Sequence, residues 1–136
     1  MPGLDPSSWL YRFDAQEWLA AAETELRLCA DAYARRSVRP AVTHARRAAG
    51  MALNAILVLR PNDTYGRSYM EHLVAAAADD DAPETIRNAA QALTVSTTLP
   101  PTLITLGKPD SRPLDAARAI TVWARIRVTA LQTPVS

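Results

Sequence analysis

The sequence predicts an all-α protein, a bundle of four or five helices in up-and-down order. Hydrophobic residues recur at alternating spacings of three and four along most of the chain, as on the buried face of a helix. Alanine and leucine supply most of the apolar residues and only 6% of residues are aromatic, which favours helices over sheets. Only TLITL at 102–106 resembles a strand, and a single strand cannot form a sheet.

The 136 residues correspond to one domain. We expect residues 1–8, which hold two prolines, a glycine and two serines, to be a flexible terminus, and residues 9–133 to form the helical domain. The net charge of +1 gives no general attraction for nucleic acid or a membrane. There is no N-terminal signal pattern and no apolar run near the roughly 18 residues that span a bilayer. These features predict a cytoplasmic protein without membrane contact.

The first predicted helix runs from Asp14 to about Arg36. Asp14 followed by Glu17 is typical of a capping box at a helix start. The apolar positions of this helix follow the spacing of a bundle seam: Ala15, Leu19, Ala22, Leu26, Cys29 and Tyr33. Cys29 lies on that seam, so we interpret it as a small buried apolar residue and not as a nucleophile. As the only cysteine it excludes an internal disulfide and a cysteine-based zinc site.

The second predicted helix, Pro40 to Arg60, is the element around which the bundle is organised. Two apolar stripes lie side by side on it, so it has several neighbours and a central position. Its six alanines let other helices come close. Gly50 costs about 1 kcal/mol relative to alanine inside a helix, so either close packing offsets this cost or the position tolerates it.

Shorter elements follow. A turn at 61–66 leads to a third helix at 67–78, and the three aspartates at 79–81 indicate a solvated loop. A fourth helix is expected at 84–93 and a last helix from Pro113 to just before Pro134. The connection at 94–112, rich in proline and threonine, is long for a compact domain and either crosses the end of the bundle or forms a functional loop.

The run His44-Ala-Arg-Arg-Ala-Ala-Gly-Met-Ala-Leu-Asn-Ala-Ile-Leu57 resembles the second helix of HEPN domains. Its histidine, alanine and leucine positions match, whereas Arg47, Gly50 and Asn54 replace the glutamine, glutamate and lysine usual in that family. The Trp-Leu-x-x-Ala-x-x-x-Leu run in the first helix resembles the family as well. The resemblance implies a HEPN-like bundle, a homodimer, and a partner protein of the small nucleotidyltransferase class, as in toxin–antitoxin pairs.

Many HEPN domains cleave RNA with an arginine and a histidine five to seven positions apart, which implies two candidate pairs here. Arg67 with His72 is one and Arg39 with His44 is the other. The arginine would stabilise phosphate charge and the histidine would transfer a proton. In the family's nucleases the motif lies on the final helix, and here that helix has no histidine. The alternative interpretation of His72 is a partly exposed structural histidine.

A basic region on the second helix is the other candidate site. His44 and Arg47 share a helix face, and with Arg39 and Arg46 they form a possible nucleotide or phosphate site. The alternative is a solvated helix end whose cations pair with Glu23, Glu25 or Asp31. No metal-binding motif, glycine-rich phosphate loop or serine elbow occurs, so we expect no metal and no cofactor.

These observations predict a non-catalytic helical binding module with a candidate nucleotide site, and the resemblance implies a HEPN-like module that pairs with a nucleotidyltransferase. A metal-independent HEPN ribonuclease using Arg67 and His72, with RNA as its substrate, is the alternative. We also predict self-association as a homodimer. Trp18 and Trp123 lie at the edges of their helix seams, where they either reach a neighbouring chain or flank the chain's own core.

Overall fold

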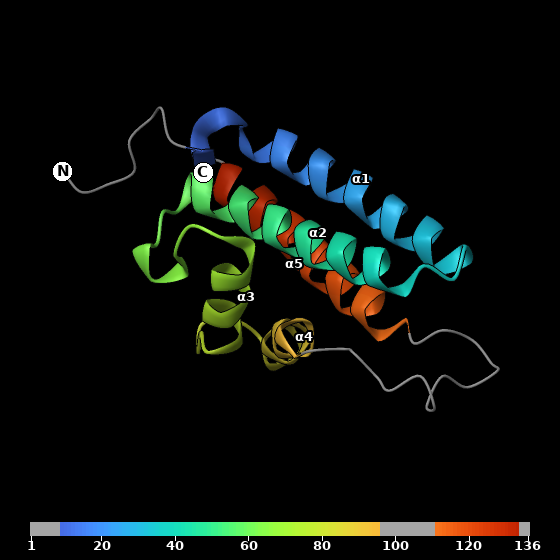
Figure 1. The fold of residues 1–136 in the computed structure, drawn as a ribbon. Helices are drawn as coiled ribbons and strands as arrows, with labels where there is room; N and C mark the ends of the chain where they lie inside the picture. The colour runs from blue at the N-terminus through green and yellow to red at the C-terminus, as the bar shows by residue number, and fades with distance from the viewer. Residues whose placement is uncertain (1–8, 96–110, 134–136) are drawn as a thin grey trace.

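The computed structural model describes residues 9–95 and 111–133, and this part of the chain is built from helices and turns (Figure 1). The elements are η1 (Trp9–Arg12), α1 (Ala15–Ala34), α2 (Val38–Leu59), η2 (Asp63–Tyr65), α3 (Tyr69–Ala77), α4 (Glu84–Thr94) and α5 (Arg112–Gln132). No strand occurs in the described residues, so the prediction of an all-α helical bundle is confirmed. The predicted flexible terminus at 1–8, the TLITL segment and most of the connection at 94–112 lie outside them.

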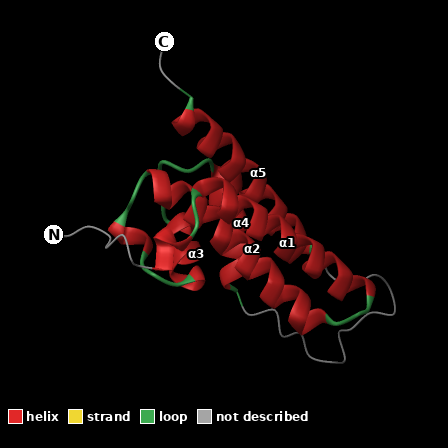
Figure 2. Cartoon of the chain, turned by 90° about the horizontal axis from the view of Figure 1, so that it is seen from above, coloured by secondary structure: helices red, strands yellow, loops and turns green. Residues whose placement is uncertain are grey.

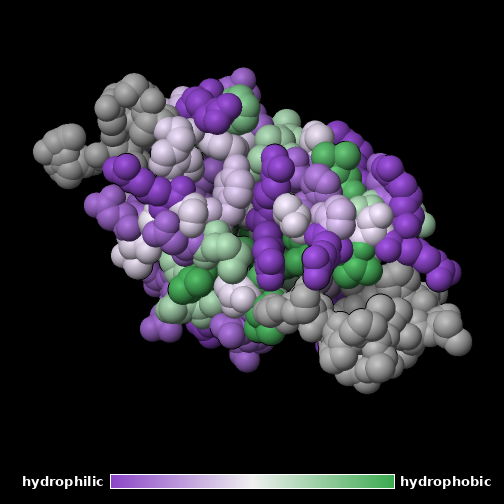
Figure 3. All heavy atoms as spheres, viewed as in Figure 1, coloured by the Kyte–Doolittle hydropathy of each residue, from purple (hydrophilic) through white to green (hydrophobic). Residues whose placement is uncertain are grey.

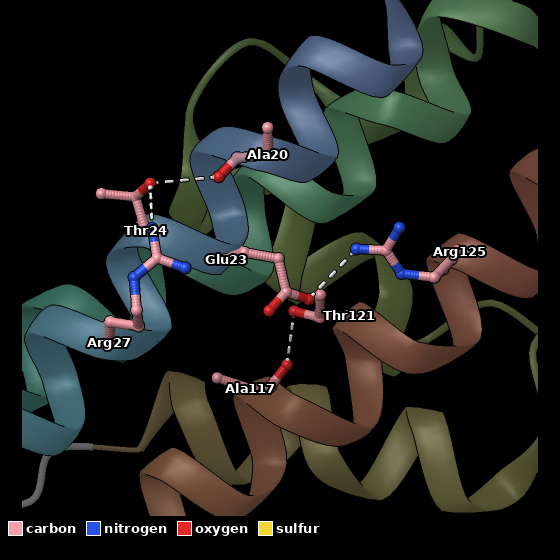
Figure 4. A network of polar contacts seen from close by, with 7 residues as sticks. All are labelled: Ala20, Glu23, Thr24, Arg27, Ala117, Thr121 and Arg125. Atoms are coloured by element: carbon pink, nitrogen blue, oxygen red, sulfur yellow. Dashed lines mark hydrogen bonds and ion pairs between the residues drawn. The ribbon is translucent and has the colours of Figure 1, made fainter.

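The three long helices form the body of the bundle (Figures 1 and 2). α1 and α2 are an antiparallel hairpin, and α5 packs against both of them. Gln16 near the start of α1 is hydrogen-bonded to Gln132 at the end of α5, and Glu23 is paired with Arg125 at 3.2 Å (Figure 4). Such pairs place α5 antiparallel to α1, so it runs in the same direction as α2. The strict up-and-down order therefore holds for α1 and α2, and the short helices α3 and α4 make the return before α5.

The helix starts follow local capping chemistry. The Asp14 carboxylate accepts from the amide of Glu17 at 2.8 Å, and the Glu17 side chain accepts from the amide of Asp14, so the predicted capping box is confirmed. α2 begins at Val38, two residues before the predicted start, because Pro40 occupies the third helical position, where no amide hydrogen is needed either. Ser68 caps α3 by accepting from the amide of Glu71, which starts that helix at Tyr69.

α2 is the central helix, as its apolar width predicts. It contacts α1, α3, α4, α5 and η1. Its six alanines have no exposed surface at all: Ala41, Ala45, Ala48, Ala49, Ala52 and Ala55. A Cβ at Gly50 would lie 2.3 Å from Cδ1 and 2.5 Å from Cβ of Tyr69. The glycine is therefore required by the close approach of α3, which decides between the two interpretations of this position.

The tryptophans are divided between the core and its edge. Trp18 is buried and its indole donates to the carbonyl of Leu10 at 2.8 Å, so this side chain flanks the chain's own core. Trp123 on α5 is partly buried. Within the described segments, no helix combines the length and apolar character that crossing a bilayer requires.

Candidate functional site

His72, a candidate catalytic residue, is buried in the middle of the protein. Its side chain has 0% exposure, so the interpretation of a partly exposed histidine is wrong. Nδ1 lies 2.7 Å from the carbonyl oxygen of Tyr65, and Nε2 lies 2.7 Å from the side-chain oxygen position of Asn54. The rings of Trp9, Tyr65 and Tyr69 surround the imidazole at centroid distances of 5.6, 6.4 and 6.4 Å. Both ring nitrogens are thus used by internal contacts.

The protonation state of His72 follows from these partners. A carbonyl oxygen only accepts, so Nδ1 carries the proton. Burial lowers the pKa of His72 from 6.5, although the hydrogen bond to Tyr65 and the charge of Glu71 oppose this shift. The neutral ring then accepts at Nε2. A 180° rotation of the Asn54 amide supplies the donor and gives its otherwise unpartnered NH₂ group a hydrogen bond.

Arg67 does not join His72 in an accessible cleft. It is exposed in the turn between Gly66 and Ser68, whereas the imidazole five residues later has no solvent contact. A general base must reach the proton that it removes, and RNA cannot approach a ring enclosed by three aromatic side chains. Arg67 and His72, one of the two pairs with the family's spacing, are therefore divided between the surface and the core.

His44 and Arg47 converge, as their helical spacing predicts, and they meet on a carboxylate of α1. Nδ1 of His44 lies 2.7 Å from Oε1 of Glu25, and Nε of Arg47 lies 3.4 Å from the same oxygen. Glu25 is buried, and a carboxylate only accepts, so Nδ1 of His44 is the donor. Glu25 is one of the three acids that the sequence offered as partners. We name this group of three side chains the Glu25 cluster.

Tyr69 and Arg12 extend the Glu25 cluster towards α3 and η1. Burial raises the pKa of Tyr69, and Glu25 adds to the increase, while the positive charges of Arg47 and Arg12 oppose it. All three charges therefore act on one phenol. Nε2 of His44 makes no hydrogen bond within the described residues, so it is the one imidazole nitrogen there with capacity for a ligand.

Arg46 and Arg39, the other two residues of the predicted phosphate site, lie apart from the Glu25 cluster. Arg46 donates from Nε to the carbonyl of Leu93 at 2.8 Å and from a terminal nitrogen to the carbonyl of Val95 at 3.1 Å. It therefore satisfies carbonyl groups at the end of α4, which is a structural role. Arg39 is exposed in the first turn of α2. The structure thus brings together two of the four basic residues.

The thiol of Cys29 is not a reactive group. The side chain is fully buried, and burial raises its pKa to about 11, although the charge of Arg118 opposes the shift. The interpretation as a small buried apolar residue is confirmed. In residues 9–95 and 111–133, no group of three or more histidine, cysteine, aspartate or glutamate side chains has the arrangement of a metal site.

An exposed apolar stripe on α5 was not recognised in the sequence. Val122 and Ile126 are 59% and 62% exposed and lie one turn apart. Ala119 and Ala130, also exposed, extend the line at helical spacing. α5 lies behind α2 in Figure 1; on the face in front, hydrophobic residues occur as separate spots among hydrophilic ones (Figure 3). The sequence signal that could have predicted this stripe is a second set of apolar residues at helical spacing in α5, offset from the set that is buried.

Comparison of the chain with protein-family models, with curated proteins and with solved structures found no match.

Proposed function

We propose that this chain is a non-catalytic helical module that binds a second protein. The observation that carries the proposal is the α5 stripe of Ala119, Val122, Ile126 and Ala130. Two branched aliphatic side chains there keep more than half of their surface in water. An apolar line on the outside of a long, well-packed helix is typical of a surface that a protein partner covers.

The resemblance to HEPN domains suggests the kind of partner. It is a small nucleotidyltransferase, as in toxin–antitoxin pairs of the cytoplasm. A homodimer is the other association that the resemblance implies, and two-fold pairing is the commonest closed arrangement of identical chains. In both associations the α5 stripe is the surface that becomes buried.

The arrangement of the two histidines supports a module without catalysis. His72 is buried with both nitrogens occupied, and His44 is held by Glu25. The burial of His72 weighs against the alternative of a ribonuclease that uses Arg67 and His72. In the second pair with the family's spacing, Arg39 is exposed in the first turn of α2 and His44 is partly exposed. Nδ1 of His44 is held by Glu25 at 2.7 Å, and the pair lies on α2 and not on the final helix, which weighs against catalysis there as well.

Light scattering coupled to size exclusion, and co-purification from the native host, test the proposal. We expect a mass above the 14.8 kDa of one chain, or a nucleotidyltransferase identified by mass spectrometry in the purified complex. The double substitution Val122→Glu with Ile126→Glu removes either association, because it places charges on the surface to be buried.

Val74→Glu is the matched control, since Val74 on α3 is 58% exposed and lies off the stripe. A mass of 14.8 kDa that stays constant on concentration, with no co-purified partner, would contradict the proposal.

Nucleotide binding at the Glu25 cluster is a second candidate function. It is favoured by the convergence of His44 and Arg47 and by the open Nε2 of His44. Glu25 already balances one positive charge there, so we expect weak binding. Calorimetric titration with AMP and ATP tests it. His44→Gln or Arg47→Gln should abolish the binding heat, while Arg36→Gln, at an exposed position outside the cluster, should preserve it.

A further inference from the structure

A cleft at one end of the bundle has the features of a small-molecule site. Its volume is about 510 Å³, within the usual range for ligand pockets. It lies between the end of α2, η2, the α3–α4 loop and α5. The lining residues that carry its chemistry are Leu53, Trp123, Arg60, Arg127, Asp79 and Asp81. None of them belongs to the Glu25 cluster or the α5 stripe.

One part of the cleft is apolar. Leu53, Ile56 and Leu57 on the last turns of α2 face the same space as Trp123 on α5. These positions come together because α2 and α5 run in the same direction. An indole beside three aliphatic side chains suits a flat or branched hydrocarbon group.

The charges of the cleft are separated by sign. The cations are Arg60 at the end of α2 and Arg127 on α5. The anions, Asp79 and Asp81, both lie in the α3–α4 loop. No ion pair within 4.0 Å joins the two sets in the described part of the chain. Opposite charges thus line one space without neutralising each other.

The acidic side is held in place. Asp79 accepts from the hydroxyl of Tyr65 at 2.6 Å and from the amide of Asp81 at 2.9 Å. Burial raises the pKa of Tyr65, and the hydrogen bond to Asp79 and the charges of Asp79 and Asp81 raise it further, so the phenol stays a donor. The carboxylate of Asp81 itself makes no hydrogen bond or ion pair with the described residues, which leaves it available to a cation.

We propose that this cleft binds a small zwitterion with an apolar body, the chemistry shared by a large apolar amino acid and a dipeptide of such residues. The ammonium group pairs with Asp81, the carboxylate with Arg60 and Arg127, and the apolar body packs on Trp123. A ligand with both charges gains contacts on both sides, whereas an anion alone gains none from the exposed Asp81. This inference does not depend on the protein partner proposed above.

Nuclear magnetic resonance of ¹⁵N-labelled protein tests it, because Trp9 and Trp18 lie outside the cleft and Trp123 reports on it. We expect L-phenylalanine or leucyl-leucine to shift the Trp123 indole signal saturably. N-acetyl-phenylalanine, which lacks the ammonium, and phenylalaninamide, which lacks the carboxylate, should bind about tenfold more weakly or worse.

Substitutions locate the contacts. Asp81→Asn and Arg127→Gln should each weaken zwitterion binding by about tenfold or more. Asp80→Asn and Arg67→Gln, at exposed positions that do not line the cleft, should leave it unchanged. Circular dichroism checks that each variant is folded, and Arg60→Gln provides a second cationic variant should Arg127→Gln unfold.

Three results would overturn the inference. One is the absence of any Trp123 shift at about 10 mM of each zwitterion, where even a millimolar site is nearly saturated. Another is equal binding of the derivatives that lack one charge. The third is a response to AMP without a response to either zwitterion, which would make the cleft a nucleotide site.

Discussion

Replacing His72 by asparagine should both destabilise the protein and remove a pH dependence of its stability. Asparagine can keep a donor near the position of Nδ1, facing the carbonyl of Tyr65, but it has no atom at Nε2. The amide of Asn54, which has 0% exposure, then has no partner. Leaving one buried polar group unsatisfied costs about 1–3 kcal/mol, and the smaller side chain leaves a void that adds to this cost.

The pH dependence follows from the lowered pKa of His72. The unfolded chain binds a proton below about pH 6.5, whereas the native imidazole stays neutral. The stability contribution is therefore fully present above pH 6.5 and is lost as the pH falls towards the native pKa. Between pH 7.5 and 5.5 the free energy of unfolding should fall by at most about 1.4 kcal/mol.

Urea unfolding followed by far-ultraviolet circular dichroism, at several pH values between 7.5 and 5.5, measures both effects. The wild type should lose stability as the pH falls, and His72→Asn should start lower and show a flat profile. His44→Gln is the matched control, because it removes the other histidine and leaves His72 intact. A flat wild-type profile, or an equal fall in His72→Asn, would refute the assignment of His72 as a buried neutral group.

Three more predictions follow from contacts described above. Gly50→Ala should destabilise the protein despite the gain of about 1 kcal/mol in helix propensity, because the new Cβ meets Cβ of Tyr69 and α3 must move; a higher melting temperature would contradict this. Arg46→Met keeps the aliphatic stem but loses two hydrogen bonds to the end of α4, so the free energy of unfolding should fall by about 1–2 kcal/mol. Hydrogen exchange should show the amides of α4 as the first to exchange faster. The purified protein should leave RNA intact without added metal, and cleavage that His72→Ala abolishes would show the opposite.

Most of the fold could be predicted from local signals in the sequence. The Asp14 capping box, the wide apolar arc of α2 and the ends of the helices depend on residues a few positions apart, so they can be read from one segment. The observed start of α2 differs from the predicted one because a proline is accommodated anywhere in the first turn of a helix. Pro40 is the third residue of that turn and not the first.

The candidate sites were harder to predict, because their partners are distant in sequence. The residues next to His72 in the sequence do not indicate that Asn54 and the carbonyl of Tyr65 will enclose it. Arg46 and Arg47 look equivalent in a basic run, yet neighbouring helical residues are about 100° apart, so one reaches α4 and the other reaches α1. The partners of Glu25 could be predicted from the sequence, because an antiparallel hairpin with its turn near residue 36 places Glu25 opposite residues 44–47.

The alanines of α2 have a consequence for the entropy of folding. Burying a long side chain costs up to about 2 kcal/mol in rotamer freedom, while alanine and glycine lose none. The alanine positions of α2 are therefore ordered at no side-chain entropy cost, while Met51, Leu53 and Leu57 on the same helix and the surrounding helices supply the larger groups that must be immobilised. The same economy makes the centre intolerant of change, since every substitution of a fully buried alanine other than glycine adds volume where helices already touch. We expect a complete substitution scan to show the six buried alanines of α2 as positions that accept almost nothing, whereas the exposed Arg39 and Thr43 on the same helix accept many residues.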